Sequence, residues 1–362
     1  MRTLALVGVL VATLAVEAFC GFLPAVNLGP RINGPYNEDG ADISPDGQLL
    51  IFSSNRPNGD WNYDLWGAVW QNGEWSEPFN LGPQVNTGAQ DIAPVFSGDG
   101  NTLYFLSNRG YGKGGFDYYQ SVWDGSAWGP AALMPGEINT PGDERPGSPS
   151  SDGSRFYFST IVSKDSASPF YSDWNGASWG SPVPIPELSG ADYQMSTAIA
   201  PLSSRLVISS SHPGGFQSWG YDLWVSTCVN GIWQPLVNLG PNINNVDAEM
   251  AAQFSAGGDT LLFVSNRPDG YGGNDIWMAV ADHRTDAAER GDLDCNSQIN
   301  IVDVTRSVDR IFRAAVPPNP CVALPTFDVA DVNCDGLLNI IDVVTVIDRA
   351  FRGGAVLPAC GP

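Results

Sequence analysis

The chain has 362 residues, of which 43% are hydrophobic and 11% aromatic, so it can bury a sizeable core and is not disordered by composition. Its formal net charge of −22 repels phosphate at long range, which argues against nucleic acid and anionic membrane surfaces as partners. Only 15% of the residues are charged, whereas 41 Gly and 28 Pro favour many short strands joined by tight turns.

Residues 1–20 are predicted to be a secretory signal peptide. The stretch MRTLALVGVLVATLAVEAFC has one Arg followed by a short apolar run, too short and too poorly flanked for a stable membrane-spanning helix. Small residues permit cleavage after Ala18 or after Cys20, and the bulky Phe19 disfavours a lipid anchor on Cys20. We therefore expect an exported protein without membrane insertion, in a compartment that permits disulfides.

Residues 21–284 contain a repeat of about fifty residues. The unit SPDGQLLIFSSNRPNGDWNYDLWGAVWQNGEWSEPFNLGPQVN, which begins at Ser44, returns in four further copies of varying fidelity. The repeated tryptophans Trp75, Trp128, Trp179 and Trp233 follow one another at steps of 53, 51 and 54 residues. Each copy predicts four short strands, which is typical of a β-propeller blade.

The repeats resemble PD40 or TolB-like propeller repeats in their S-P-D-G, S-N-R, D-x-W and N-L-G-P motifs. The last copy ends at DIWMAVADHR without its closing strand, and a matching segment, FLPAVNLGPRIN, stands at the mature N-terminus. Supplying that strand from the other end of the chain would close the ring and leave no open edge. We therefore predict a mainly β fold with five blades; six blades, as in related TolB-like propellers, is the alternative.

Four of the five predicted blades begin their first strand with an acid: Glu38, Asp91, Glu144 and Glu249. If these strands line the channel, the acids form a ring near one mouth, where they would bind a cation or a basic ligand. Alternatively they pair with the arginines of the S-N-R motifs, Arg56, Arg109 and Arg267, and tie blade to blade. Repetition in nearly every blade favours the structural interpretation, because an active site is normally asymmetric.

The loops before the D-x-W strands are rich in Gly and aromatic residues. Exposed aromatic faces stack on apolar ligand surfaces such as sugar rings, although propeller aromatics also pack between blades. The candidate stacking residues are Trp61, Tyr63, Tyr111, Phe116, Phe216, Trp219 and Tyr271. No nucleophile motif, zinc-binding motif or phosphate loop accompanies them, so no catalytic residue is assigned and catalysis stays the minority interpretation.

Beyond a linker at residues 285–290, residues 291–362 are predicted to form a small all-α calcium-binding domain. Two blocks, 292–313 and 331–352, superpose with an offset of 39 residues and carry oxygen ligands at the spacing of a twelve-residue calcium loop. The first set is Asp292, Asp294, Asn296, the Gln298 carbonyl, Asn300 and Asp303. The second is Asp331, Asn333, Asp335, the Leu337 carbonyl, Asn339 and Asp342, and each set predicts one Ca²⁺.

An Asp at position 12 and an Asn at position 9 depart from an ordinary EF-hand and resemble the type I dockerin repeat. The resemblance implies a calcium-dependent fold, a cohesin-like partner and frequent attachment to polysaccharide-degrading proteins. Dockerins help to choose their partner with positions 10 and 11, which here are Ile301, Val302, Ile340 and Ile341. These apolar pairs either face a cohesin-like surface or pack within the domain.

Four of the six cysteines fall in this C-terminal segment. The resemblance implies two loop-helix units lying antiparallel, which would pair Cys295 with Cys360 and Cys321 with Cys334. Spacing alone does not fix the connectivity. Two disulfides and two ions would support a domain whose core is small.

Taken together, the sequence favours a secreted, non-catalytic binding or scaffolding protein. Its propeller would present a ligand surface, with polysaccharide as the candidate ligand, and its C-terminal segment would dock to a cohesin-like extracellular protein. One alternative is a glycoside hydrolase built on the same propeller. The other is a purely structural propeller at the cell surface.

Overall fold

A computed structural model describes residues 21–282, except 58, 60–61, 164–165, 190–193, 202–203 and 217–219. The side chains of 162–163, 166 and 194 are also outside the described part. The predicted signal peptide, the linker and the whole predicted calcium-binding segment lie outside the described residues. The described residues include no helix long and apolar enough to cross a membrane.

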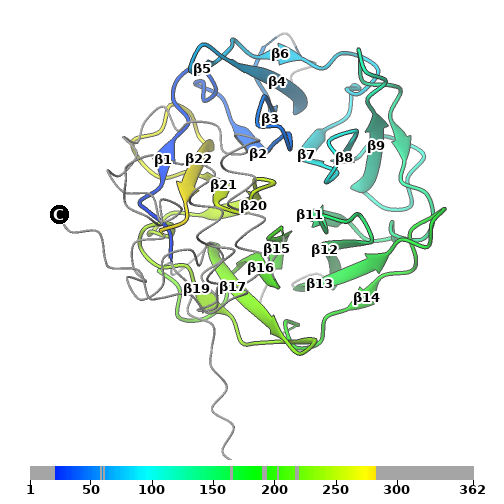
Figure 1. The fold of residues 1–362 in the computed structure, drawn as a ribbon, viewed down its shortest axis with the longest axis vertical. Helices are drawn as coiled ribbons and strands as arrows, with labels where there is room; N and C mark the ends of the chain where they lie inside the picture. Colours follow the sequence, from blue (N-terminus) through cyan, green and yellow to red (C-terminus); the bar gives the residue numbers. More distant parts are fainter. Residues whose placement is uncertain are drawn as a thin grey trace, which may run out of the picture.

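The described chain forms a five-bladed β-propeller (Figure 1). Each blade is an antiparallel sheet whose first strand lies nearest the central axis, and the prediction of five blades is confirmed. Blade 1 consists of β2 (Glu38–Ile43), β3 (Leu49–Ser54), β4 (Asp64–Gln71), β5 (Glu74–Trp75) and β6 (Phe79–Asn80). Blade 2 consists of β7 (Asp91–Phe96), β8 (Thr102–Ser107), β9 (Asp117–Val122) and β10 (Ala132–Leu133). Blade 3 consists of β11 (Glu144–Pro149), β12 (Arg155–Ser163), β13 (Ser166–Asp173) and β14 (Val183–Pro184). Blade 4 consists of β15 (Gln194–Ile199), β16 (Arg205–Ser210), β17 (Asp222–Val229), β18 (Ile232–Trp233) and β19 (Val237–Asn238). Blade 5 consists of β20 (Glu249–Phe254), β21 (Thr260–Ser265), β22 (Asp275–Val280) and the N-terminal strand β1 (Val26–Asn27).

The ring closes through its N-terminal strand, as the sequence predicts. β1 pairs antiparallel with β22, in the register Val26 with Met278 and Asn27 with Trp277. The side chain of Asn33 bonds both the N–H and the C=O of Ile276, as Asn86 does for Leu65 within blade 1. The N-terminal segment therefore replaces the missing outer strand of blade 5, and no blade edge is left open at the closure.

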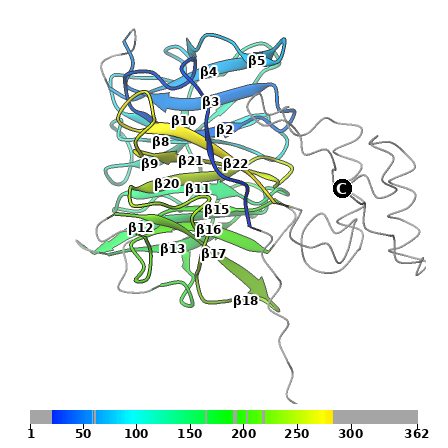
Figure 2. The same ribbon diagram turned by 90° about the vertical axis from the view of Figure 1, so that its left-hand side faces the viewer.

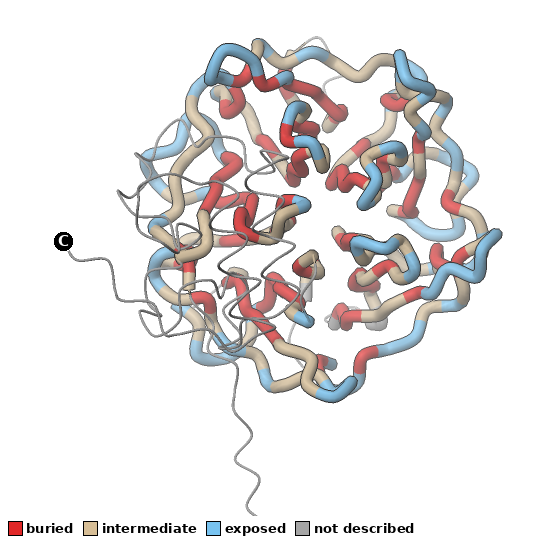
Figure 3. Tube along the Cα trace, viewed as in Figure 1, coloured by how far each residue is buried: buried red, intermediate tan, exposed pale blue. Residues whose placement is uncertain are grey.

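The hydrophobic core lies between the blades rather than at the centre. Five clusters of buried side chains occupy the five junctions between neighbouring sheets. Burial in Figure 3 accordingly follows the strand interiors, while the loops are exposed. Consecutive apolar residues in strands such as LLIFSS supply both faces of each sheet, because successive side chains point to opposite faces. Both faces are needed, since every sheet packs against a neighbour on each side.

The two faces of the disc have different loops, as the edge-on view shows (Figure 2). We call the face where the innermost strands begin the acid face, because Glu38, Asp91, Glu144 and Glu249 stand there. The opposite face, with the D-G turns and the Trp hairpins, is called the turn face. All five innermost strands contain a shift of register typical of a β-bulge, which increases their local twist.

The central channel is narrowed by side chains from opposite blades. Gln253 of β20 donates from Nε2 to the carbonyl oxygen of Gly147 in β11, over 3.1 Å. A cavity of about 90 Å³ remains beside it, lined by residues of all five innermost strands. A cavity of this size is smaller than the usual small-ligand site, so the faces of the disc are the better candidates for a ligand surface.

Candidate functional site

Three of the four predicted channel-mouth acids are fully buried and ion-paired. Glu38 lies 3.0 Å from Arg56, Asp91 lies 2.5 Å from Arg109, and Glu249 lies 3.0 Å from Arg267. All three carboxylates have no exposed surface. Each pair lies within one blade and joins the first strand to the end of the second, so an arginine of the same blade balances the charge of each carboxylate.

The S-N-R motif builds this arrangement with each of its three residues. In blade 2, the Nε of Arg109 donates to Oγ of Ser107, and a second guanidinium nitrogen donates to the carbonyl oxygen of Val85. The guanidinium also stacks over the ring of Tyr119, 4.8 Å from its centroid. Asn108 accepts a bond from the N–H of Gln90 and anchors the start of the first strand. The arginine thus links its own blade to the segment arriving from the preceding blade.

Glu144 in blade 3 has the same position but no arginine. Its Oε1 accepts bonds from Thr140 and Thr160, while its Oε2 is buried without a hydrogen-bond partner. Burial, opposed by the Thr140 bonds, raises the pKa of Glu144 to about 8, so the carboxyl is mainly protonated at neutral pH. For comparison, burial raises the pKa of the arginine-paired Glu249 to about 7.

One carboxylate on the acid face, Asp39, belongs to no repeated motif. It follows Glu38 at the second position of β2 and is half-buried, and burial raises its pKa to about 6. Asp39 and Glu38 also act on the nearby phenol of Tyr63. Burial, together with the negative charges of these two residues, raises the pKa of Tyr63 to about 12. The other blades place Ile92, Arg145, Met195 and Met250 at this position, so no repeated motif marks it.

The aspartate that begins the third strand of a blade holds the loop that precedes it. In blade 2, Asp117 accepts bonds from the N–H groups of Lys113 and Gly114. A Cβ on Gly112 would lie 1.8 Å from Oδ2 of Asp117, so the loop requires glycine there. In blade 5, Asp275 accepts from the N–H of Tyr271 in the same way, over 2.6 Å. The loops are therefore fixed platforms for the residues at their tips.

The predicted stacking residues divide into two groups. Tyr111, Phe216 and Tyr271 are exposed on the acid face, and Tyr111 is fully so. Tyr63 and Phe116 are half-buried. Trp61 and Trp219 lie outside the described residues.

Tyr111 also has a backbone conformation that is rare for its residue type. Its φ is +82°, and the equivalent Asp269 in blade 5 has φ +76°. Asp and Asn adopt this left-handed region readily, whereas for a bulky residue it is a genuine outlier. A fully exposed tyrosine held at such a position gains nothing from packing, which singles it out as a candidate ligand contact.

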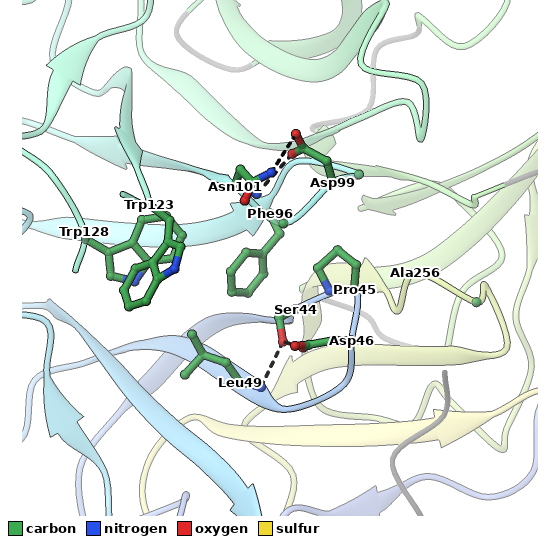
Figure 4. A pocket seen from close by; sticks show the side chains of 13 residues that line it. Ser44, Pro45, Asp46, Leu49, Phe96, Asp99, Asn101, Trp123, Trp128 and Ala256 are labelled. Atoms are coloured by element: carbon green, nitrogen blue, oxygen red, sulfur yellow. Dashed lines mark hydrogen bonds between the residues drawn. The ribbon is translucent and has the colours of Figure 1, made fainter. Parts of the chain in front are cut away.

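A pocket on the turn face was not expected from the sequence. It lies between blades 1 and 2, has a volume of about 730 Å³ and is lined by Trp123 and Trp128 together with two D-G turns (Figure 4). Only Trp128 belongs to the tryptophans that recur in the repeat, and the structure shows that both indoles stay partly exposed. Elsewhere in the described ranges, no three His, Cys, Asp or Glu side chains gather as a metal site requires.

No protein-family description matches the chain, and no curated protein matches it either. Solved structures are similar in fold. A TolB from Agrobacterium tumefaciens is 15% identical over 67% of this chain and 73% of its own, with a TM-score of 0.41. The TolB of Acinetobacter baumannii is 14% identical over 72% of this chain and 64% of its own, with a TM-score of 0.44. The catalytic domain of a GH62 α-L-arabinofuranosidase from Coprinopsis cinerea is 13% identical, covers 72% of this chain and 97% of its own, and has a TM-score of 0.46. These likenesses concern the propeller alone, and identities so low carry no site residue across.

Proposed function

We propose that this protein is a secreted, non-catalytic binding protein whose propeller presents a ligand surface for an extracellular polysaccharide. The observation that carries the proposal is the exposed, conformationally strained Tyr111 on a loop fixed by Asp117. Tyr271 and Phe216 are exposed on sister loops of the same face. Aromatic side chains on rigid loops bind sugar rings at little cost in conformational entropy.

The buried ion pairs argue against hydrolysis at the channel mouth. A glycosidase uses two carboxyl groups facing the scissile bond, and in most families one of them is protonated. Glu38, Asp91 and Glu249 are fully buried and held by arginines, so they face no substrate. The acid face therefore offers no matched pair of solvent-facing carboxyl groups among the acids that the repeat supplies.

Hydrolysis of glycosidic bonds is the second candidate, and one observation favours it. Glu144 has a pKa of about 8 and keeps its proton at neutral pH, as a general acid must. Its carboxyl has no exposed surface, however, so substrate access would require Thr140 and Thr160 to move. Loss of any glycan-cleaving activity in Glu144→Gln would support this candidate.

The C-terminal segment is proposed to dock the propeller to a cohesin-like extracellular protein. Support comes from the two sequence blocks, each of which supplies three carboxylates with amide and backbone oxygens at calcium-loop spacing. Two Ca²⁺ ions bound there would hold the two loops in their folded form. Capture of partners from the extracellular fraction, with and without a calcium chelator, tests the role: partners retained under chelation contradict it.

Binding by the acid face is tested by removing its most exposed aromatic ring. Tyr111→Ala should lower the amount of full-length protein retained on insoluble xylan or cellulose by about tenfold, the equivalent of one lost ring stack. Phe79→Ala is the matched control, because Phe79 is also an exposed aromatic residue but lies on the outer strand β6. Equal retention of all three proteins would contradict the proposal.

A further inference from the structure

The turn face carries a pocket that the aromatic loops of the acid face do not share. Its apolar wall consists of Trp123, Trp128, Phe96 and Leu49, and its rim carries the D-G turns of blades 1 and 2 (Figure 4). A third turn, at Ala256 in blade 5, reaches it from the axis side. Its volume of about 730 Å³ falls within the usual range for small-ligand sites.

The pocket lies where the Trp hairpin of blade 2 is less covered than those of blades 1 and 3. The indole pairs of blades 1, 2 and 3 have similar geometry, with ring centroids 4.9, 5.3 and 5.2 Å apart. The second tryptophan is buried in blade 1 (Trp75) and in blade 3 (Trp179), with exposures of 6% and 3%. Trp128 of blade 2 is only partly buried.

The connections between blades explain this difference. In blade 3, the backbone of Trp179 pairs with Pro135 and Glu137 of the arriving segment, which brings that segment against the hairpin. In blade 1, Arg31 donates to the carbonyl oxygen of Trp75. In blade 2 the equivalent segment bonds further along, from the N–H of Ala131 to the carbonyl oxygen of Gln84. The contact is shifted past Trp128, and the indole faces the pocket.

The rim supplies oriented acceptors and carries no positive charge. Oδ1 of Asp46 accepts from Ser44 Oγ and from the N–H of Gln48, which fixes the side chain and leaves Oδ2 available. Asp99 is fixed in the same way by Ser97 and Asn101. The bond from Ser97, with those from Asn101, lowers the pKa of Asp99, so this acceptor is ionised at neutral pH. Among the described residues, no Lys, Arg or His lines the pocket.

From this geometry we propose that the pocket binds a neutral pyranose sugar at the end or along the chain of a polysaccharide. The apolar face of the ring stacks on Trp123, and its hydroxyl groups donate to Asp46 and Asp99 and exchange bonds with Asn101. Carboxylates that accept from hydroxyl groups repel phosphate, sulfate and uronate, so acidic glycans are excluded. The inference rests on the proposed function in taking the propeller for a glycan-binding module, but it places a separate subsite on the opposite face.

Calorimetric titration of the full-length protein in calcium-containing buffer tests the proposal. The probes are cello-, xylo- and manno-oligosaccharides, with oligogalacturonate as the anionic contrast and oligomeric chitosan as the cationic contrast. Trp123→Ala should weaken binding of the neutral probe about tenfold. Ala256→Arg, at an exposed turn position that reaches the pocket, should weaken it without removing any core contact.

Trp174→Ala is the matched control, because Trp174 occupies the same hairpin position in blade 3, is exposed, and does not line the pocket. Unchanged affinity in Trp174→Ala, with losses in both pocket variants, supports the site. Wild-type affinity in Trp123→Ala and Ala256→Arg overturns it, as does binding of chitosan or oligogalacturonate in preference to every neutral probe. If only Tyr111→Ala loses affinity, the pocket proposal fails while the proposed function stands; if no probe binds any variant and insoluble polysaccharide retains none, both fail.

Discussion

Blades 2 and 3 are built on the same repeat, yet the candidate ligand contacts gather in one and not in the other. Blade 2 has the Asp91–Arg109 ion pair and a Trp hairpin that lines a pocket. The long loop between its second and third strands carries the exposed Tyr111. Blade 3 joins β12 to β13 by only two residues and covers Trp179. The repeat therefore determines the strands of each blade, whereas the candidate ligand contacts depend on which side chains stay exposed.

The same two blades also differ in how they hold the acid at the start of the innermost strand. In blade 2 the carboxylate is balanced by a guanidinium, and in blade 3 Glu144 is kept neutral by burial. Both solutions avoid an uncompensated buried charge, which costs several kcal/mol. Substitutions in blades 2 and 3 test this difference.

Arg109→Met removes the cation of blade 2 while keeping most of the side-chain volume. It leaves the buried carboxylate of Asp91 uncompensated, so we expect a loss of about 3–5 kcal/mol in the free energy of unfolding. Urea unfolding at pH 7, followed by tryptophan fluorescence, measures the loss. A change below about 1 kcal/mol would show that the pair contributes no more than an exposed salt bridge.

Gly112→Ala places a methyl group against the carboxylate of Asp117, where the Cβ would lie 1.8 Å from Oδ2. The loop or the aspartate must shift, and we expect a destabilisation of about 1–3 kcal/mol together with weaker polysaccharide retention. Gly110→Ala is the control, because a Cβ there meets nothing within 4 Å. Equal stability of the two variants would contradict the role assigned to Asp117.

Glu144→Gln tests the protonated state of the acid in blade 3. Burial raises the folded-state pKa from 4.5 to about 8, so the stability linked to this group is fully present below pH 4.5. It is lost as the pH rises through about 8, with a slope of about 1.4 kcal/mol per pH unit. The amide of the variant does not titrate, so its free energy of unfolding should rise relative to that of the wild type as the pH increases from 4.5 to about 8. Parallel stability curves would contradict the raised pKa.

Tyr111→Asn replaces the strained tyrosine with a residue that tolerates positive φ. We expect a gain of up to about 1 kcal/mol in stability, combined with a loss of polysaccharide retention. A variant that gains stability but loses polysaccharide retention would indicate that the tyrosine serves ligand binding and not folding. If stability falls with binding, Tyr111 makes structural contacts instead.

The repeat was enough to predict the architecture, because D-G turns, S-N-R motifs and tryptophans recur at one spacing. The missing strand after Val280 and its counterpart at Val26 even predicted how the ring closes. The pairing of Glu38 with Arg56 was one of two interpretations left open, and the structure shows that bond directly.

The sites were harder to predict, because exposure depends on small differences between copies. Trp75, Trp128 and Trp179 are equivalent in sequence, and the different course of the arriving segment accompanies the partial exposure of Trp128. Asp39 belongs to no repeated motif, and the positive φ of Tyr111 is not marked by its residue type. The predicted calcium ligands and disulfides lie outside the described residues and stay predictions.

Binding to a polysaccharide and cleavage of it can be measured on one sample. Full-length protein is incubated with insoluble xylan, cellulose or mannan in calcium-containing buffer, and both the protein left in solution and the reducing ends released are followed over time. A non-catalytic binding propeller predicts depletion of the protein from solution with no release of reducing ends above the polysaccharide blank. Release of reducing ends that is abolished in Glu144→Gln would contradict the account and establish the hydrolase instead.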